Sequence, residues 1–219
     1  MKRHFHDELK ALKQKLLSMS FLVESALEKA VEAFLGRNEK LILEIFDEEE
    51  TINQFEIEID DQGHALLAVG QPMAFDLRSL TAILKINTDL ERLGDHAVNI
   101  AERARTLLRE PPLPEDYDLP KMARATLHLF RQAIDSFMND DADSARNVLL
   151  SDDEVDLYND NLFKRITTAM QKDPSLVKTG VNLMMIGHNL ERTADLATNI
   201  AEDVIYMKQG KEVRHRIET

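Results

Sequence analysis

The segment Asp89–Glu102, "DLERLGDHAVNIAE", recurs as Asn189–Glu202, "NLERTADLATNIAE". Nine of the fourteen positions are identical, and the two copies lie 100 residues apart. In both copies apolar residues follow one another at intervals of three and four, the spacing of an α-helix that packs one face against a core. The chain therefore carries one acidic helical motif twice.

The repeat extends beyond this motif. The stretch "AVEAFLGRNEKLILEIFDEEETIN" from Ala30 resembles "AIDSFMNDDADSARNVLLSDDEVD" from Ala133 at an offset of 103 residues. The offset falls from 103 to 100 at the motif, so the second half has lost three residues between its second and third helices. A loop tolerates such a deletion, and a register that changes only in a loop indicates a duplicated unit of three helices.

Helix breakers divide the chain into segments. Four of the six prolines lie in "EPPLPEDYDLP", residues 110–120, which is typical of a linker, and Pro72 and Pro174 occupy matching places in the two halves. The apolar spacing predicts helices near residues 5–36, 39–69, 75–109, 118–139, 142–172 and 176–208. We therefore predict an all-α fold of six long helices in two tandem antiparallel three-helix bundles, residues 1–110 and 121–219, joined by a linker at 111–120.

The composition restricts the possible functions. The net charge is −13, and Lys and Arg are dispersed, so we expect no nucleic-acid partner. No apolar run approaches the roughly 20 residues that span a bilayer, so we expect no membrane insertion. The absence of cysteine excludes disulfides and thiolate zinc sites. The N-terminal residues mix charges into their apolar spacing, unlike a signal peptide, which favours a cytoplasmic location.

The acidic residues of the motif form a stripe. Glu91, Asp95, Asn99 and Glu102 lie within about 80° of one another on a helix that turns 100° per residue, opposite the apolar face. The second copy repeats the stripe with Glu191, Asp195, Asn199 and Glu202. The preceding helix of the first half carries a related stripe, Glu49, Asn53, Glu56 and Asp60, with Asp152, Asp156 and Asn159 as partial counterparts. We expect the paired stripes to lie side by side on an outer face.

Carboxylates one helical turn apart repel each other, and a bound cation would reverse the sign of that interaction. Carboxylate and amide oxygens without sulfur favour hard cations such as Mg²⁺, Ca²⁺, Mn²⁺ or iron. The alternative is a solvated surface that Arg92 or Arg103 neutralises. The sequence contains no P-loop, dinucleotide fingerprint or nucleophile elbow, and none of its seven histidines forms the paired Glu-x-x-His set of a di-iron bundle. We therefore expect no enzyme.

The two motif copies, "LERLGDHAVNIAE" and "LERTADLATNIAE", together with "QPMAFDLRSLTAILKI" before the first copy, resemble the PhoU family of phosphate-signalling proteins. The resemblance covers about residues 5–210. It implies a cytoplasmic, often homodimeric protein of two three-helix bundles that is not an enzyme. Such proteins negatively regulate the phosphate-starvation response, together with the ATPase subunit of the phosphate ABC transporter and a sensor histidine kinase.

The resemblance also implies metal binding, because some members hold iron or other metal clusters at the acidic stripes. The expected metal is iron or another hard divalent cation, ahead of Zn²⁺. The ligands it implies are Glu91, Asp95, Asn99, Glu102, Glu49 and Asn53 in the first half, and Glu191, Asp195, Asn199, Glu202, Asp152 and Asp156 in the second. Asn53 replaces the acid found at Asp156, and Gly94 becomes Ala194, so we expect either a weaker first site or two sites that hold metal only under metal-rich conditions.

Two other functions compete with a regulatory adaptor. The first is a metal-binding or metal-storing helical protein, or a metalloenzyme, unrelated to phosphate signalling. The second is a plain scaffold in which the acidic stripes are only solvated surface.

Overall fold

The computed structural model describes residues 2–70, 72–111 and 117–213. It contains helices α1 (Lys2–Leu35), α2 (Glu39–Gly70), α3 (Phe75–Leu107), α4 (Leu119–Met138), α5 (Ala142–Ser151), α6 (Asp153–Lys172) and α7 (Val177–Gln209), with a 3₁₀ turn, η1 (Pro174–Leu176), before α7. Within the described ranges there is no strand, and the all-α prediction is confirmed.

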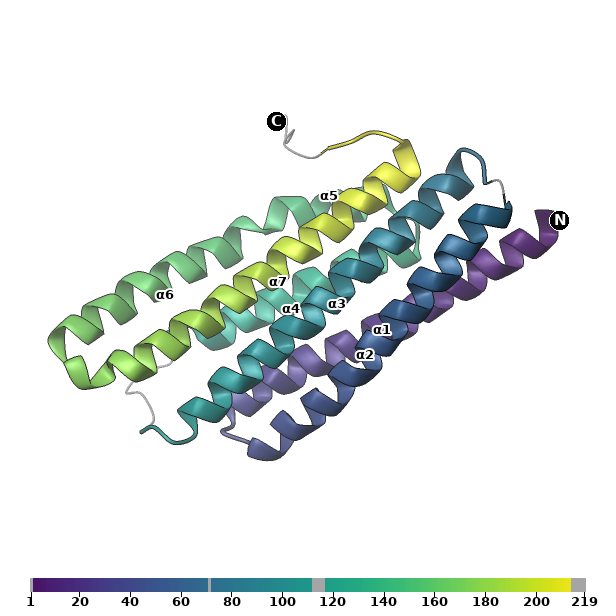
Figure 1. The fold of residues 1–219 in the computed structure, drawn as a ribbon. Coiled ribbons are helices and arrows are strands. Elements are labelled where there is room, and N and C mark those ends of the chain that lie inside the picture. Colours follow the sequence, from purple (N-terminus) through teal and green to yellow (C-terminus); the bar gives the residue numbers. More distant parts are fainter. Residues whose placement is uncertain (1, 71, 112–116, 214–219) are drawn as a thin grey trace.

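One predicted helix is divided. The sequence predicts a single helix over residues 142–172, but α5 ends at Ser151 and α6 begins at Asp153, with Asp152 between them. The dihedral angles of Asp152 stay helical (φ −66°, ψ −36°), so the two pieces continue in one direction (Figure 1). The Asp152 carbonyl accepts from Val155 N at 2.9 Å, whereas Asp156 N lies 3.5 Å away. The turn is therefore tightened where the second acidic stripe begins.

The proline-containing junctions start helices, as the sequence predicts. Residues 112–116 of the predicted linker lie outside the described part of the chain. Pro120 stands in the first turn of α4, where a backbone N–H has no hydrogen-bond acceptor within the helix, so proline is tolerated there. Tyr117 and Asp118 take left-handed conformations (φ 52° and 63°), which turn the chain into α4. Pro174 opens η1 in the place that corresponds to Pro72 before α3.

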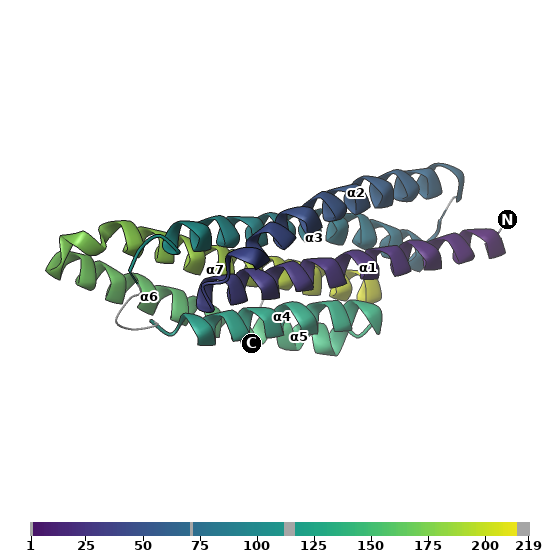
Figure 2. The same ribbon diagram turned by 90° about the horizontal axis from the view of Figure 1, so that it is seen from below.

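Helices α3 and α7, the carriers of the repeated motif, lie antiparallel at the centre of the molecule. Arg78 near the start of α3 donates to the Met207 carbonyl near the end of α7 at 2.9 Å. Farther along, His96 Nδ1 lies 3.0 Å from Asn189 Oδ1. In Figure 1 the helices α6, α7, α3 and α2 lie side by side, and Figure 2 shows α1 and α4 in the layer behind them.

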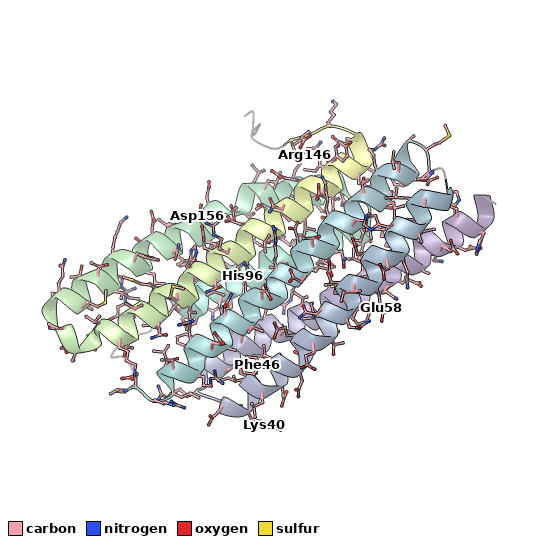
Figure 3. The ribbon with its side chains drawn as sticks, viewed as in Figure 1. Lys40, Phe46, Glu58, His96, Arg146 and Asp156 are labelled. Carbon is pink, nitrogen blue, oxygen red and sulfur yellow. The ribbon has the colours of Figure 1, made fainter. Side chains whose placement is uncertain are left out.

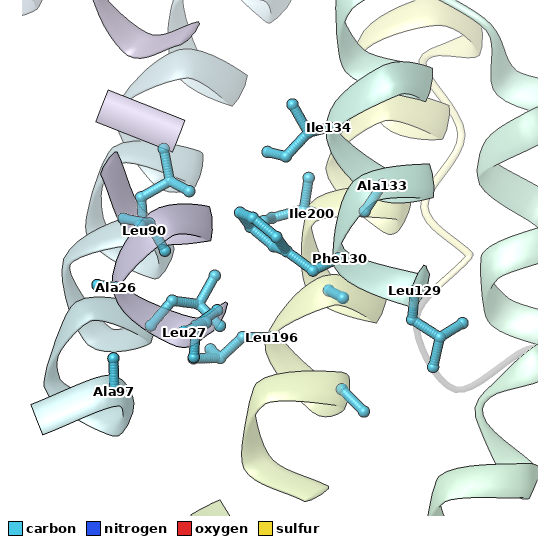
Figure 4. Close-up of a cluster of buried hydrophobic side chains, with 14 of the residues drawn as sticks. Ala26, Leu27, Leu90, Ala97, Leu129, Phe130, Ala133, Ile134, Leu196 and Ile200 are labelled. Carbon is cyan, nitrogen blue, oxygen red and sulfur yellow. The ribbon is translucent and has the colours of Figure 1, made fainter. Parts of the chain in front are cut away.

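The two halves share one hydrophobic core. Leu27 of α1 and Leu90 of α3 are at most 1% exposed, as are Phe130 of α4 and Ile200 of α7. Figure 4 shows the side chains of α1 and α3 facing those of α4 and α7. Burying a side chain of this size stabilises the fold by about 1.5–3 kcal/mol. The two predicted bundles are therefore repeats in sequence whose buried side chains meet in one core.

The outer faces of the helices are mixed, because large apolar side chains such as Phe21 and Leu43 are exposed among the polar ones. None of the helices in the described ranges combines the length and the apolarity that crossing a membrane requires. Asp76 stands in the first turn of α3, 3.5 Å from His6 Nε2.

An ion pair also joins the central helices. Lys85 Nζ of α3 donates to Asp203 Oδ1 of α7 at 2.8 Å, and the Asp203 side chain is only 3% exposed. The repeat-related positions are Met185 and Arg103, which cannot form an ion pair, so the contact between the two halves has no symmetry-related copy. A buried carboxylate needs such a partner, because water does not reach it.

We predict that Lys85→Met destabilises the protein by about 1.5–3 kcal/mol, because it removes a hydrogen bond to a buried charge. Thermal or urea unfolding measures this change. The control is Lys40→Met, since Lys40 is 84% exposed and 3.8 Å from Glu44. That variant should change stability by less than about 0.5 kcal/mol. Equal losses of stability in the two variants would show that the Lys85–Asp203 pair stabilises the fold no more than an exposed ion pair does.

Candidate functional site

The acidic stripes lie along two helix–helix grooves. The first stripe runs between α2 and α3, and the second runs between α6 and α7, where Figure 3 labels Asp156. None of the twelve predicted ligands is buried, and Asn53, Asp95, Asn99 and Asp156 are exposed. The others are partly covered by the neighbouring helix. The outward orientation predicted from the helical wheel is therefore confirmed, and each stripe lies in the groove between two neighbouring helices.

In the first half the stripes of α2 and α3 interact across the groove. Burial raises the pKa of Glu49, and repulsion from Asp95 and Glu102 on α3 raises it further. Burial likewise raises the pKa of Glu91, with Asp95 and then Glu56 of α2 as the next causes. These carboxylates are therefore close enough to repel one another, as the antiparallel pairing of stripes predicts.

The second half repeats this arrangement with more burial. Burial raises the pKa of Asp152 to about 6, and Asp156 and Asp195 are the next causes. Burial also raises the pKa of Asp156 and of Glu191, and in both cases Asp195 is the next cause. Asp152, Asp156, Glu191 and Asp195 thus form one acidic group across α6 and α7.

Arginines neutralise part of this charge. Arg192 Nη1 lies 3.0 Å from Asp195 Oδ2, and Arg192 Nε lies 3.8 Å from Glu191 Oε2. In the first half Arg103 Nη2 lies 3.8 Å from Glu102 Oε2. Arg92 lowers the pKa of Glu91, although burial and Asp95 outweigh it and the pKa stays raised. The interpretation of the stripes as neutralised surface therefore holds for part of each stripe.

Three buried oxygens of the second groove accept no hydrogen bond, although Glu191 Oε2 lies within ion-pair distance of His188 and Arg192. Asp152 Oδ1, Asn159 Oδ1 and Glu191 Oε2 are shielded from solvent and take part in no hydrogen bond. Asp152 stands at the N-cap of α6, but its side chain caps no backbone N–H. A buried acceptor without a donor is costly.

Some of the predicted ligands also border other hollows, away from the acidic groups of the α2–α3 and α6–α7 grooves. Asn99 and Asn199 line a hollow of about 490 Å³ between α3 and α7, together with Asp95 and Asp195. Glu202 lines neighbouring hollows beside Lys85 and Asp203. Asn199 and Glu202, at the C-terminal end of the α7 stripe, therefore border the groove between α7 and α3.

Sequence reasoning missed the residues that bridge the two halves. Arg92 and Arg192 line the central hollow from opposite sides, and their identity in both motif copies was the available signal. His96, labelled in Figure 3, lies in the same hollow, and burial lowers its pKa. Nothing in the sequence distinguishes His96, because the second copy has Leu196 at that position.

The chemistry of the grooves suits a hard cation better in the second half than in the first. Oxygen donors dominate both grooves, but the unpartnered carboxylate oxygens among the stripe residues belong to α6 and α7. Across the described residues, no three His, Cys, Asp or Glu side chains are gathered closely enough to hold a metal ion. A cation would therefore have to draw the carboxylates inward against their mutual repulsion.

We predict that Asp152→Asn raises the melting temperature at pH 7.5 in the presence of a chelator. The pKa of Asp152 is about 6 in the folded protein against an ordinary 3.8, so its contribution to stability is lost as the pH rises from about 3.8 to about 6. Asparagine does not ionise, so the gain should vanish near pH 4. The exposed Asp61 of α2 supplies the control, Asp61→Asn, which should shift the melting temperature little at either pH. A gain that is equal at both pH values would contradict this account.

Comparison with known proteins connects the geometry to a family. A model of the PhoU domain matches residues 16–104 and again residues 119–204. The PhoU homolog of Aquifex aeolicus, a phosphate-specific transport system accessory protein, is 36% identical over 209 residues, which cover 95% of each chain. The homolog of Pseudomonas aeruginosa, of the same description, is 35% identical over 214 residues, 97% of this chain and 88% of that one.

Solved structures agree with these matches. The crystal structure of PhoU from Pseudomonas aeruginosa has a TM-score of 0.92 at 35% identity, over 94% of this chain and all of that chain (100%). The phosphate transport system regulatory protein PhoU from Streptococcus pneumoniae has a TM-score of 0.88 at 31% identity, over 95% and 99% of the two chains. With two domain matches, a common fold and relatives along nearly its whole length, the chain belongs to the PhoU family.

Proposed function

We propose that this chain regulates phosphate uptake and the phosphate-starvation response as a non-enzymatic adaptor. The observation that carries the proposal is the PhoU domain found twice, over residues 16–104 and 119–204. Relatives at 36% and 35% identity are described as accessory proteins of the phosphate-specific transport system. The solved relative from Streptococcus pneumoniae is described as a regulatory protein of phosphate transport.

The partners in this proposal are the ATPase subunit of the phosphate ABC transporter and a sensor histidine kinase, with a homodimer as the working form. A net charge of −13 favours partner surfaces with basic patches. Association between opposite charges is fast at low salt and slows as salt screens them. The long polar helix faces offer surfaces of this kind on both sides of the central α3–α7 pair.

An adaptor fits the grooves better than an enzyme does. Catalytic sites are usually concave and partly dry, so that water is excluded from the reaction. Here Asp95, Asn99 and Asp156 are exposed on open helix faces. The family also consists of regulatory accessory proteins, which is consistent with a role without chemistry.

Metal binding at the acidic grooves is part of the proposal. The twelve predicted ligands supply the oxygen donors that iron, Mn²⁺, Mg²⁺ or Ca²⁺ prefer. The carboxylates repel one another across both grooves, so a bound cation would relieve that repulsion and stiffen the helix pairs. In this proposal the cation holds the surface in the form that partners bind.

A metal store unrelated to phosphate is the second candidate, and the three unpartnered oxygens of the second groove favour it equally. The two functions differ in their consequences for the cell. A store changes the metal content of the cell, whereas an adaptor changes phosphate signalling. One genetic experiment therefore separates them.

Deletion of the gene should leave starvation genes expressed in phosphate-rich medium at the level of phosphate-starved cells. A reporter under a starvation promoter and the uptake of labelled phosphate measure the effect, and the wild-type gene supplied in trans should restore repression. Purification of the tagged chain at low salt should recover the transporter ATPase. Unchanged reporter expression and unchanged uptake in the deletion strain would refute the adaptor.

The double variant Asp95→Ala, Asp195→Ala should lose most of the metal that the wild-type protein retains when it is purified without chelators. Each substitution removes a carboxylate that lies among the acids of its groove. Elemental analysis measures the content, with Asp47→Ala, an exposed acid of α2 outside the predicted stripes, as the control. Equal metal content in all three proteins would contradict metal binding at these faces.

A further inference from the structure

The groove between α6 and α7 changes character along its length. On α6, Phe163 follows Asp156 by seven residues, and on α7, His188 and Val181 precede Asp195 by seven and fourteen residues. Seven residues make almost two helical turns, so each series stays on the face of its helix that carries the acids. Toward the turn that joins the two helices, the lining of the groove therefore passes from acidic to apolar.

Close packing of the two helices places these apolar residues opposite one another. A Cβ atom added to Gly187 would lie 2.3 Å from Leu162 Cδ2, and one added to Gly180 would lie 2.9 Å from Ile166 Cγ2. Phe163 stands between Leu162 and Ile166 on α6. It therefore lies opposite the part of α7 between the two glycines.

Four exposed apolar side chains gather at this end of the groove and are called the apolar patch: Phe163 of α6, and Val177, Val181 and Met185 of α7. Each of them is between 41% and 49% exposed. The three residues of α7 follow one another at intervals of four, so a single face of the helix presents them. Apolar side chains that gather on one face, unlike those scattered singly over a surface, mark an interaction site.

The fold does not require the apolar patch. Three of its four residues have polar counterparts in the first half: Asp60, Thr81 and Lys85. Asp60 Oδ2 lies 3.2 Å from His64 Nδ1, and Lys85 pairs with Asp203, so two of these counterparts make ion pairs within the chain. The first half therefore packs the equivalent pair of helices with polar residues where the second half exposes apolar ones.

Uncompensated negative charge borders the apolar patch on α6. Asp153, Asp156 and Asp160 are exposed, and none of them takes part in an ion pair among the described residues. Burial raises the pKa of Asp156, and repulsion from Asp195, Asp153 and Asp160 raises it further. On α7, Arg192 already lies 3.0 Å from Asp195. A segment that covers the apolar patch is therefore favoured if it places Lys or Arg next to α6.

We propose that the apolar patch is the docking surface for an amphipathic helix of a partner protein. The apolar side of that helix packs on Phe163 and Val181, and its flank toward Asp156 carries Lys or Arg. A groove between two helices accepts a third helix through apolar side chains at intervals of three and four residues. The α6–α7 hairpin also projects beyond the other helices at one end of the molecule, which leaves room for such a helix (Figure 1, Figure 2).

The inference rests on the proposed adaptor function for the existence of a partner. It adds to that function the face that the partner contacts and the chemistry of the segment that it contributes. The exposed methionine of the patch suits this role, because a flexible thioether side chain adapts its shape to the surface that it meets.

Two designed peptides of about 18 residues, or about five helical turns, test the docking surface. Both form amphipathic helices with the same leucine face, and the polar face carries lysine in one and glutamate in the other. Fluorescence anisotropy of the labelled peptides gives their dissociation constants from the full-length chain. The lysine peptide should bind about tenfold more tightly or better, because acids border the apolar patch. Equal binding of the two peptides would overturn the proposed charge of the partner helix.

The double variant Phe163→Ser, Val181→Thr removes apolar surface without a change of charge. It should weaken binding of the lysine peptide by about tenfold or more, an effect common for the loss of a central aromatic side chain. The matched control is Leu157→Ser, Leu150→Thr, since these leucines are 62% and 68% exposed and point away from α7. The control should weaken binding by less than about twofold, and circular dichroism shows that each variant folds. Equal weakening by both double variants would overturn the docking surface.

A second copy of this chain is the competing occupant, and light scattering identifies it. The Phe163→Ser, Val181→Thr variant should keep the oligomeric state of the wild-type protein. Conversion of a wild-type dimer into a monomer by this variant would make the apolar patch a contact between copies and would overturn docking of another protein.

The deletion strain separates this inference from the adaptor function. The Phe163→Ser, Val181→Thr variant should fail to restore repression of the starvation reporter, whereas the leucine control should restore it. Full restoration by the Phe163→Ser, Val181→Thr variant would overturn the docking surface and leave the adaptor standing. A deletion without effect on the reporter would refute the adaptor, and selective binding of the lysine peptide would then still support the docking surface.

Discussion

The antiparallel packing of α3 against α7 is the constraint on which the rest of the molecule depends. These two helices carry the repeated motif, and their apolar sides build the core that α1 and α4 complete from behind. Once those sides face inward, the acidic residues of the same helices must lie at the outer grooves, because a helix turns about 100° per residue. The position of the acids is therefore a consequence of core packing.

Much of this was predictable from the sequence. Apolar spacing and prolines located the helices, since a helix face must be continuous to pack and proline cannot stand in its interior. The break at Asp152 was not predictable, because its dihedral angles stay helical and the irregularity is one local hydrogen bond that spans three residues instead of four. Two close approaches also escaped sequence reasoning: that of α6 to Gly187 of α7, where an added Cβ would lie 2.3 Å from Leu162 Cδ2, and that of His96 to Asn189. Both depend on how two helices meet, and the pattern along one helix does not contain that distance.

In the acidic grooves, partial burial and repulsion between like charges both destabilise the ionised carboxylates. A carboxylate that is partly covered by a neighbouring helix loses water, and each further acid nearby adds repulsion. The large shared core supplies most of the stability, so the protein stays folded despite this local destabilisation in the acidic grooves. Arg192 reduces the cost at Asp195 but leaves Asp152 without a cationic partner among the described residues.

The covalent joining of two similar halves in one chain has an evolutionary consequence. In a symmetric pair of identical subunits, every substitution appears twice, and both copies of a surface change together. Here the first half has Lys85 where the second has Met185, the second half has Asp203 where the first has Arg103, and Gly187 of the second half stands where the first has Asn87. A duplicated gene fused end to end can specialise its halves separately while the internal symmetry still dictates the architecture.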